Sequence, residues 1–222
     1  SINTRMNYYT PANYVIHPNP ERWGGHRSGR LYQYDVYLKA VEICQREHYS
    51  WVLDLGCGDG DKVHVLTNAG LNVIGVAPTI NDIPESRRAS YAMIFEADLD
   101  APAFHAETDP SKTMTLPPDM LVLCADVIEH LVYPEYLLEG IAALKCRALI
   151  STPDRLRIYK DTPEHNGPPL NPGHVREWSR AEFARFVSDY MRVVESGGMP
   201  QFYDPGRDKR GPGGTQYVVT LP

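Results

Sequence analysis

Short, uninterrupted apolar runs alternate with helical stretches through the middle of this sequence. The apolar runs are WVLDL (51–55), NVIGVA (72–77), YAMIFEA (91–97), DMLVLCA (119–125) and RALIST (147–152). The segments VHVLTNAG (63–70) and PEYLLEGIAAL (134–144) have helical spacing. Strands that are apolar along their whole length are typical of parallel sheets covered on both faces. The pattern therefore predicts an α/β three-layer sandwich with a mostly parallel sheet.

The last part of the chain predicts a different kind of connection. RAEFARFVSDY (180–190) has helical spacing, with Ser179 as its N-cap and Glu182 at the capping-box position. The runs MRVVES (191–196) and TQYVVTL (215–221) follow as strands. Their link fits a hairpin-like return better than a crossover helix, so we expect the final strand to be antiparallel.

Three segments outside this alternation predict an irregular arm, a helix and a long loop. Residues 1–30 carry three prolines and a GG pair without periodicity, which predicts an irregular N-terminal arm. Residues 31–49 predict an amphipathic helix with Leu31, Tyr34, Leu38 and Val41 on one face. Residues 153–175 are proline-rich and too long for a routine connection, so we expect an active-site loop within a single domain, 1–222.

Composition narrows the function classes. Lys and Arg number 22 against 28 Asp and Glu, a net charge of -6 that disfavours nucleic acid as a partner. The four cysteines form no CxxC pair, so we expect reduced thiols. There is no apolar run of the roughly twenty residues that a membrane span needs, and no secretory pattern. We expect a cytoplasmic protein without membrane contact; a homodimer is one assembly the sequence allows.

The run VLDLGCGDG (52–60) is the strongest functional signal. A strand ends beside an acid, Asp54, and glycines then let the backbone turn tightly before a helix. Glycines allow a ligand to lie against the backbone, and a helix start offers free N–H groups. The spacing D-x-G-x-G-x-G differs from the dinucleotide fingerprint G-x-G-x-x-G. An acid beside the turn also points away from dinucleotides, because it repels a pyrophosphate and attracts the ammonium group of an amino acid.

This run resembles the first motif of class I S-adenosylmethionine-dependent methyltransferases, over residues 51–221. The resemblance implies a Rossmann-like seven-stranded, mostly parallel sheet with an antiparallel C-terminal strand, and S-adenosyl-L-methionine as cofactor. It implies that Asp54, Gly56, Cys57 and Gly58 line the methionine end of the cofactor. It also implies that Asp98, in FEADL, accepts the adenine amino group while Leu99 contacts the ring.

One position departs from the family. An acid that holds the ribose hydroxyls closes the second strand in these enzymes, but this sequence has Ala77 there. Weaker ribose binding, a changed cofactor, or a substitute such as Asn81 or Asp82 are the alternatives, and we place the substitute first.

The second cluster is ADVIEHL (125–131). If a helix starts here, Asp126, Glu129 and His130 share one face at the carboxyl end of the sheet, where such folds bind ligands. The alternative is that His130 packs and Glu129 is solvated, because many methyltransferases carry an E-H pair at this point without a metal.

The third cluster contains His174, in GHVREWS (173–179). This run resembles a segment of bacterial sugar- and polysaccharide-tailoring O-methyltransferases, and the H-x-x-E-W-T-R segment of small-RNA 3′-terminal 2′-O-methyltransferases. The RNA enzymes combine that histidine with an E-x-x-E-H face to hold a divalent metal. The resemblance implies a ligand set of Asp126, Glu129, His130 and His174, suited to Mg²⁺ in part and to Mn²⁺ better.

These residues predict O-methyl transfer to a sugar or oligosaccharide hydroxyl. Asp126, His130 and His174 are the catalytic candidates, as a base or through a metal, and the sequence does not decide between the two. The aromatic residues of the arm and of the helix after it are candidates for closing over the cofactor and stacking on a sugar ring, although packing alone explains any one of them: Tyr8, Tyr9, Tyr14, Trp23, Tyr32 and Tyr34. The alternatives are 2′-O-methylation of RNA 3′ ends and a catalytically silent cofactor-binding protein.

Overall fold

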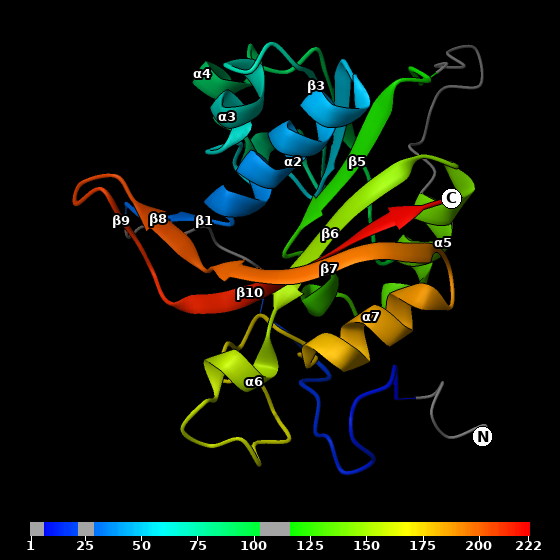
Figure 1. Ribbon diagram of the computed structural model, residues 1–222, viewed down its shortest axis with the longest axis vertical. Helices are drawn as coiled ribbons and strands as arrows, with labels where there is room; N and C mark the ends of the chain where they lie inside the picture. The colour runs from blue at the N-terminus through cyan, green and yellow to red at the C-terminus, as the bar shows by residue number, and fades with distance from the viewer. Residues whose placement is uncertain (1–6, 22–28, 103–115) are drawn as a thin grey trace.

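The computed structural model describes residues 7–21, 29–102 and 116–222. A seven-stranded sheet forms its centre (Figure 1). The strands, in spatial order, are β4 (Met93–Glu96), β3 (Asn72–Ala77), β2 (Trp51–Leu55), β5 (Met120–Ala125), β6 (Arg147–Pro153), β10 (Gly213–Leu221) and β7 (Arg192–Pro200). The first five are parallel, and β10 is antiparallel to both β6 and β7. The predicted mostly parallel sheet with an antiparallel C-terminal strand is confirmed.

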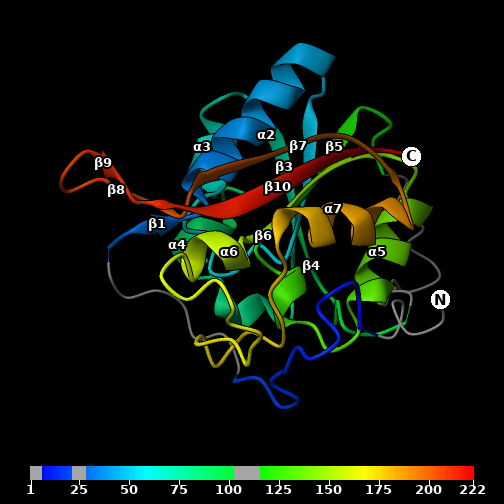
Figure 2. The same ribbon diagram turned by 60° about the horizontal axis from the view of Figure 1, so that its bottom comes forward.

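Helices cover both faces of this sheet. One face carries α2 (Tyr34–Glu47) and α3 (Val63–Thr67), and the other carries α5 (Pro134–Ala143) and α7 (Arg180–Ser188) (Figures 1 and 2). Alternate residues of β2 enter the two cores: Val52 packs with the α2 side, and Leu53 with the α5 side. Burial of both strand faces explains the continuous apolar runs in the sequence, and the three-layer sandwich is confirmed.

Shorter elements connect these layers. They are the one-turn helices α4 (Glu85–Arg88) and α6 (Arg155–Ile158) and the 3-10 turns η1 (Ile80–Asp82) and η2 (Ile128–His130). The α7 helix begins as expected, because the Ser179 side chain accepts from the Glu182 backbone and the Glu182 side chain accepts from the Ser179 backbone. Among the described residues, no helix combines the length and the apolar character needed to span a membrane.

The predicted amphipathic helix is confirmed as α2, but its fully buried residues differ from the apolar set that predicted it. The helix buries Val36, Tyr37, Ala40, Ile43 and Cys44, while Leu38 keeps 37% of its surface exposed. Two apolar stripes overlap on this helix, and tertiary packing selects the one that reaches the sheet. Leu31 lies outside the helix, in the short strand β1 (Leu31–Tyr32).

A small second sheet adds a feature that the sequence did not predict. β1 pairs with β8 (Phe202–Asp204), which pairs with β9 (Lys209–Arg210). β8 and β9 form a hairpin that projects from the link between β7 and β10, and β1 pairs with its first strand (Figure 1). The predicted hairpin-like return is therefore present, with paired strands at its tip.

The described part of the N-terminal arm, residues 7–21, contains no helix or strand and lies along the proline-rich loop. Backbone N–H groups of Val15, His17 and Glu21 donate to carbonyl oxygens of residues 166, 175 and 172. The aromatic residues of this segment are used in packing: Tyr8 bonds Glu135 at 3.0 Å, and Tyr14 accepts from the Glu177 N–H at 2.9 Å. Residues 1–6 and 22–28 of the predicted arm lie outside the described residues.

Candidate functional site

The turn after β2 brings the backbone close to its neighbours. Gly56 has a φ of +76°, and an added Cβ would lie 2.4 Å from Val127 Cγ2, so no other residue fits here without displacement. The N–H groups of Gly56 and Cys57 both donate to the Val76 carbonyl, which holds the turn against β3. Gly58 also has a positive φ, +59°.

A cavity of about 320 Å³ opens beside this turn. Its lining includes five of the six predicted cofactor residues: Gly56, Cys57, Gly58, Asp98 and Leu99. Of the two proposed substitutes for a ribose-binding acid, Asp82 lines the cavity and Asn81 does not. The glycines and the acids that line this cavity fit a nucleoside-bearing cofactor with an amino-acid tail.

Asp54 lies next to the cavity but is not part of its lining. Its side chain is 1% exposed, and the Tyr37 hydroxyl donates to Oδ2 at 2.8 Å. Oδ1 is buried without a hydrogen-bond partner among the described residues. Burial raises the pKa of this carboxyl to about 7, against the opposing effects of Tyr37 and Lys62. A buried, underused carboxylate oxygen beside the turn fits the ammonium group of an amino-acid ligand.

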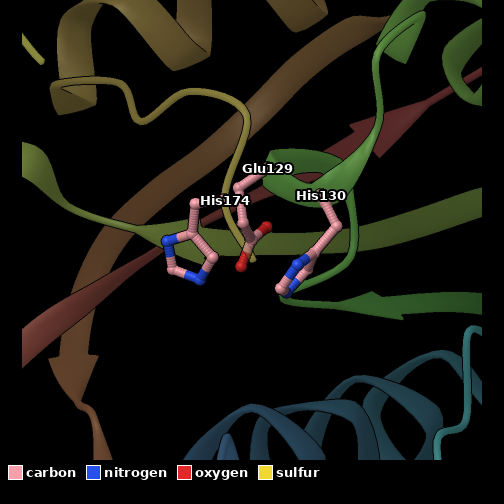
Figure 3. Close-up of side chains that lie close together, drawn as sticks. All are labelled: Glu129, His130 and His174. Carbon is pink, nitrogen blue, oxygen red and sulfur yellow. The ribbon is translucent and has the colours of Figure 1, made fainter. Parts of the chain in front are cut away.

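Glu129, His130 and His174 form a second group next to this cavity. Their ligand atoms all lie within 4.8 Å of one another, and the Glu129 carboxylate lies between the two imidazole rings (Figure 3). His130 belongs to both places, because it also lines the cavity. The N–H of Val175 donates to the Glu129 carbonyl at 2.7 Å, which joins η2 to the loop that carries His174.

Hydrogen bonds fix the orientation and the tautomer of both imidazole rings. The Gly173 carbonyl lies 2.7 Å from His130 Nδ1, and a Glu177 carboxylate oxygen lies 2.6 Å from His174 Nδ1. Both oxygens accept, so each Nδ1 carries the proton and each Nε2 carries the lone pair. Asn171 Nδ2 donates to His174 Nε2 at 2.9 Å, and its amide is oriented by the Gly173 N–H.

This donor set fits a divalent cation that takes the His174 Nε2 lone pair in place of the Asn171 amide. Metal-binding histidines usually donate their other N–H to a carbonyl or carboxylate, as both do here. Glu129 is fully buried; Thr152 donates to Oε2 at 3.0 Å, and Oε1 has no partner among the described residues. Burial, and then the charge of Asp126, raise the pKa of Glu129 well above its usual value. A cation between these groups would satisfy that oxygen and keep the carboxylate ionised.

Asp126 is not a member of the three-residue group. Its two oxygens accept from Ser151 Oγ at 2.5 Å and from Gln33 Nε2 at 3.0 Å, and the residue lines the cavity. The expected helix from Asp126 is wrong: Asp126 has a left-handed φ of +51°, and only a 3-10 turn forms, starting at Ile128. Because of this backbone reversal, the i, i+3, i+4 face does not form. Burial raises the pKa of Asp126, against the hydrogen bonds from Ser151 and Gln33.

Sequence reasoning missed the residues that support the site. Glu177 is 1% exposed and holds His174, and its i+3 spacing from that histidine was the available signal. Ser151 and Gln33 hold Asp126 from positions 25 and 93 residues away, and no local pattern marks them.

The sequence matches no family model, and comparison with curated proteins finds no relative. Solved structures do resemble the fold. Magnesium protoporphyrin IX methyltransferase (ChlM) from Synechocystis PCC 6803, with bound SAH, has a TM-score of 0.55 at 15% identity, over 85% of this chain and 83% of that one.

The methyltransferase domain of bacterial CtHen1-C has a TM-score of 0.54 at 18% identity, over 85% of this chain and 97% of that one. The small RNA methyltransferase HEN1 has a TM-score of 0.56 at 18% identity, over 91% of this chain and 27% of that one. The chain therefore has the fold of class I S-adenosylmethionine-dependent methyltransferases.

Proposed function

We propose that this protein transfers a methyl group from S-adenosyl-L-methionine to a hydroxyl of a sugar or oligosaccharide, assisted by a divalent cation. The observation that carries the proposal is the place of His130, which lines the cavity beside the glycine turn and belongs to the group with Glu129 and His174. A cofactor in the cavity and a cation in the group would be neighbours. Methyl transfer is an in-line displacement, which requires such alignment.

In this proposal, different residues in and beside the cavity bind different parts of the cofactor. Gly56, Cys57 and Gly58 hold the methionine end, with Asp54 as the carboxylate for its ammonium group. Asp98 accepts the adenine amino group and Leu99 contacts the ring. Asp82 lies in the cavity lining where Ala77 supplies no carboxylate, and we assign it to the ribose hydroxyls.

The metal site uses Glu129, His130 and His174. A bound Mg²⁺ or Mn²⁺ supplies Lewis acidity that lowers the pKa of a hydroxyl, and two nitrogen donors favour Mn²⁺. With both imidazoles used in this way, Asp126 is the carboxylate left to accept the hydroxyl proton, oriented by Ser151 and Gln33. Without a metal, His130 or His174 takes the role of general base, as a neutral imidazole suits.

RNA 2′-O-methylation at 3′ ends is the second candidate. The D-x-x-E-H run with a distant histidine and the structural likeness to the HEN1 proteins favour it. The net charge of -6 favours a small glycan, because RNA binding depends on many cationic contacts to phosphates. A silent cofactor-binding protein is the third reading, motivated by Ala77.

Calorimetry with S-adenosyl-L-methionine, followed by methyl transfer to a panel of saccharides and RNA 3′ ends, tests the proposal. We expect turnover on a saccharide that requires Mn²⁺ or Mg²⁺ and is abolished by a chelator. His174→Ala should lose this activity. His165→Ala should keep it, because His165 lies in the same loop but outside the group. Cofactor binding without turnover on any acceptor would favour the silent reading, and absence of binding would overturn the proposal.

A further inference from the structure

A second cavity, of about 400 Å³, lies over the ends of β7 and β10. Its lining includes two arginines, Arg157 and Arg180, together with Gly198 and Gly214, and no carboxylate among the described residues lines it. A concave surface with two guanidinium groups and no lining acid is suited to an oxyanion.

The fold places this cavity at the same edge of the sheet as the candidate site, because Thr215 of its lining pairs with Pro153 at the carboxyl end of β6. Arg157 is on α6, which follows β6 directly, and Arg180 is the first residue of α7. Arg155 of α6 binds Glu182 of α7, which joins the two helices. Ser151 of β6 bonds Asp126, and Asp154, three residues later, contacts Arg180. At the rise of an extended strand this separation is about 10 Å, a span comparable with a short oligosaccharide.

The two arginines retain unused binding capacity. Arg157 is exposed and makes no ion pair within the described ranges. Arg180 contacts Asp154 at 3.4 Å, and its buried Nε has no hydrogen-bond partner in the described part of the chain. The neighbouring Arg155 differs, because it is bound to both carboxylate oxygens of Glu182, at 2.7 and 2.9 Å. Arg155 therefore has a structural partner, and Arg157 has no ion-pair partner among the described residues.

Gly198 supports the placement of Arg180. An added Cβ would lie 2.3 Å from Arg180 Nη2, so the guanidinium occupies the space that a side chain would fill. The bare backbone of β7 thus leaves room for Arg180 at the wall of the cavity.

We propose that this cavity binds an acidic group of the acceptor, so that the substrate is an acidic saccharide carrying a carboxylate or a phosphate ester. The inference rests on the proposed function, which supplies the saccharide hydroxyl at the other end of the span. Arg157 and Arg180, with the buried Asp154 beside them, provide enough positive charge to bind one acidic group. The successive phosphates of RNA require many more cationic contacts.

The test uses three monosaccharide probes that differ only at carbon 6: glucose, glucuronic acid and glucose 6-phosphate. Their binding to the whole protein is followed by NMR, from the backbone amide signals of Gly198, Gly213 and Gly214. We expect one or both acids to bind at least about tenfold more tightly than glucose. The preferred acid identifies the source of the oxyanion.

Variants separate the cavity from general charge. Arg157→Gln should lower acid binding about tenfold, because it removes one of two charged donors. Arg192→Gln, which removes the same charge from the opposite end of β7, should leave binding unchanged. Arg157 is the informative position, because an exposed side chain without an ion pair among the described residues can be replaced without disturbing the fold. Arg180→Gln is the second variant.

Three results would overturn the inference. They are equal binding of all three probes, equal losses in the Arg157 and Arg192 variants, and binding of a dinucleotide RNA in the absence of binding by either acidic sugar. Calorimetry with S-adenosyl-L-methionine on the same samples separates the two proposals. Cofactor binding without preference for acids overturns only the acidic subsite, and acid binding without cofactor binding overturns only the methyltransferase function.

Discussion

The buried carboxyl of Asp54, next to the candidate cofactor cavity, should make the free energy of unfolding depend on pH. The unfolded chain releases this proton near pH 3.8, whereas burial keeps it on the folded protein up to about pH 7. Between these values the folded state binds more protons, so the contribution to stability is fully present below the unfolded pKa and is lost as pH rises through the folded pKa. The difference between the two pKa values corresponds to about 4 kcal/mol.

The Asp54→Asn variant removes this titration while keeping an oxygen that can accept from Tyr37. Between pH 6 and pH 8.5, the wild-type protein should lose about 1.4 kcal/mol of stability through Asp54, and the variant should lack this loss. Urea denaturation at the two pH values measures it. Asp161→Asn is the control, because it removes the same charge from an exposed position and should leave the pH dependence intact.

Cofactor binding should change in the opposite direction. An ammonium group beside Asp54 favours the ionised carboxylate, so wild-type affinity for S-adenosyl-L-methionine should rise as pH passes 7. Asp54→Asn should lower that affinity by about tenfold to a hundredfold, the value of a charge-assisted hydrogen bond. If the variant has the same stability profile as the wild type and binds the cofactor equally well, the reasoning about Asp54 is refuted.

Three further changes test the other parts of the site. Gly56→Ala should cost stability beyond the roughly 1–2 kcal/mol of a left-handed alanine, because its Cβ meets a side chain 2.4 Å away; Gly70→Ala is the control, since φ there is +81° and nothing lies within 4 Å. Thermal denaturation compares the two, and equal losses would contradict the contact argument. Glu177→Gln should weaken Mn²⁺ binding about tenfold by calorimetry, because it removes the charge that holds His174; unchanged affinity would assign Glu177 to structure alone. Glu129→Gln should raise the stability of the metal-free protein to urea at pH 8, because it removes a buried carboxylate whose pKa is raised by burial. The same variant should abolish Mn²⁺ binding. A loss of stability would show that the buried carboxylate does not destabilise the folded protein.

The sequence alone determined much of the fold because the decisive signals were local. A strand buried on both faces must be apolar throughout, as in residues 51–55, and a tight turn beside a close neighbour requires glycine, as at Gly56. Such constraints act within a few residues and are readable from composition and spacing. They predicted the sheet and its antiparallel final strand, and the family resemblance of the glycine turn implied five residues of the cavity lining.

Tertiary structure decided which side chains meet. The sequence placed Asp126 with Glu129 and His130 because an α-helix would put the three on one face. The left-handed backbone of Asp126 prevents that helix, and its side chain bonds Ser151 and Gln33 instead. The N–H of Val175, the residue after His174, donates to the Glu129 carbonyl across 46 residues of sequence, which brings His174 to Glu129. The arginine cavity collects residues from α6, α7, β7 and β10. Contacts between distant segments depend on the path of every intervening loop, and no local pattern encodes that path.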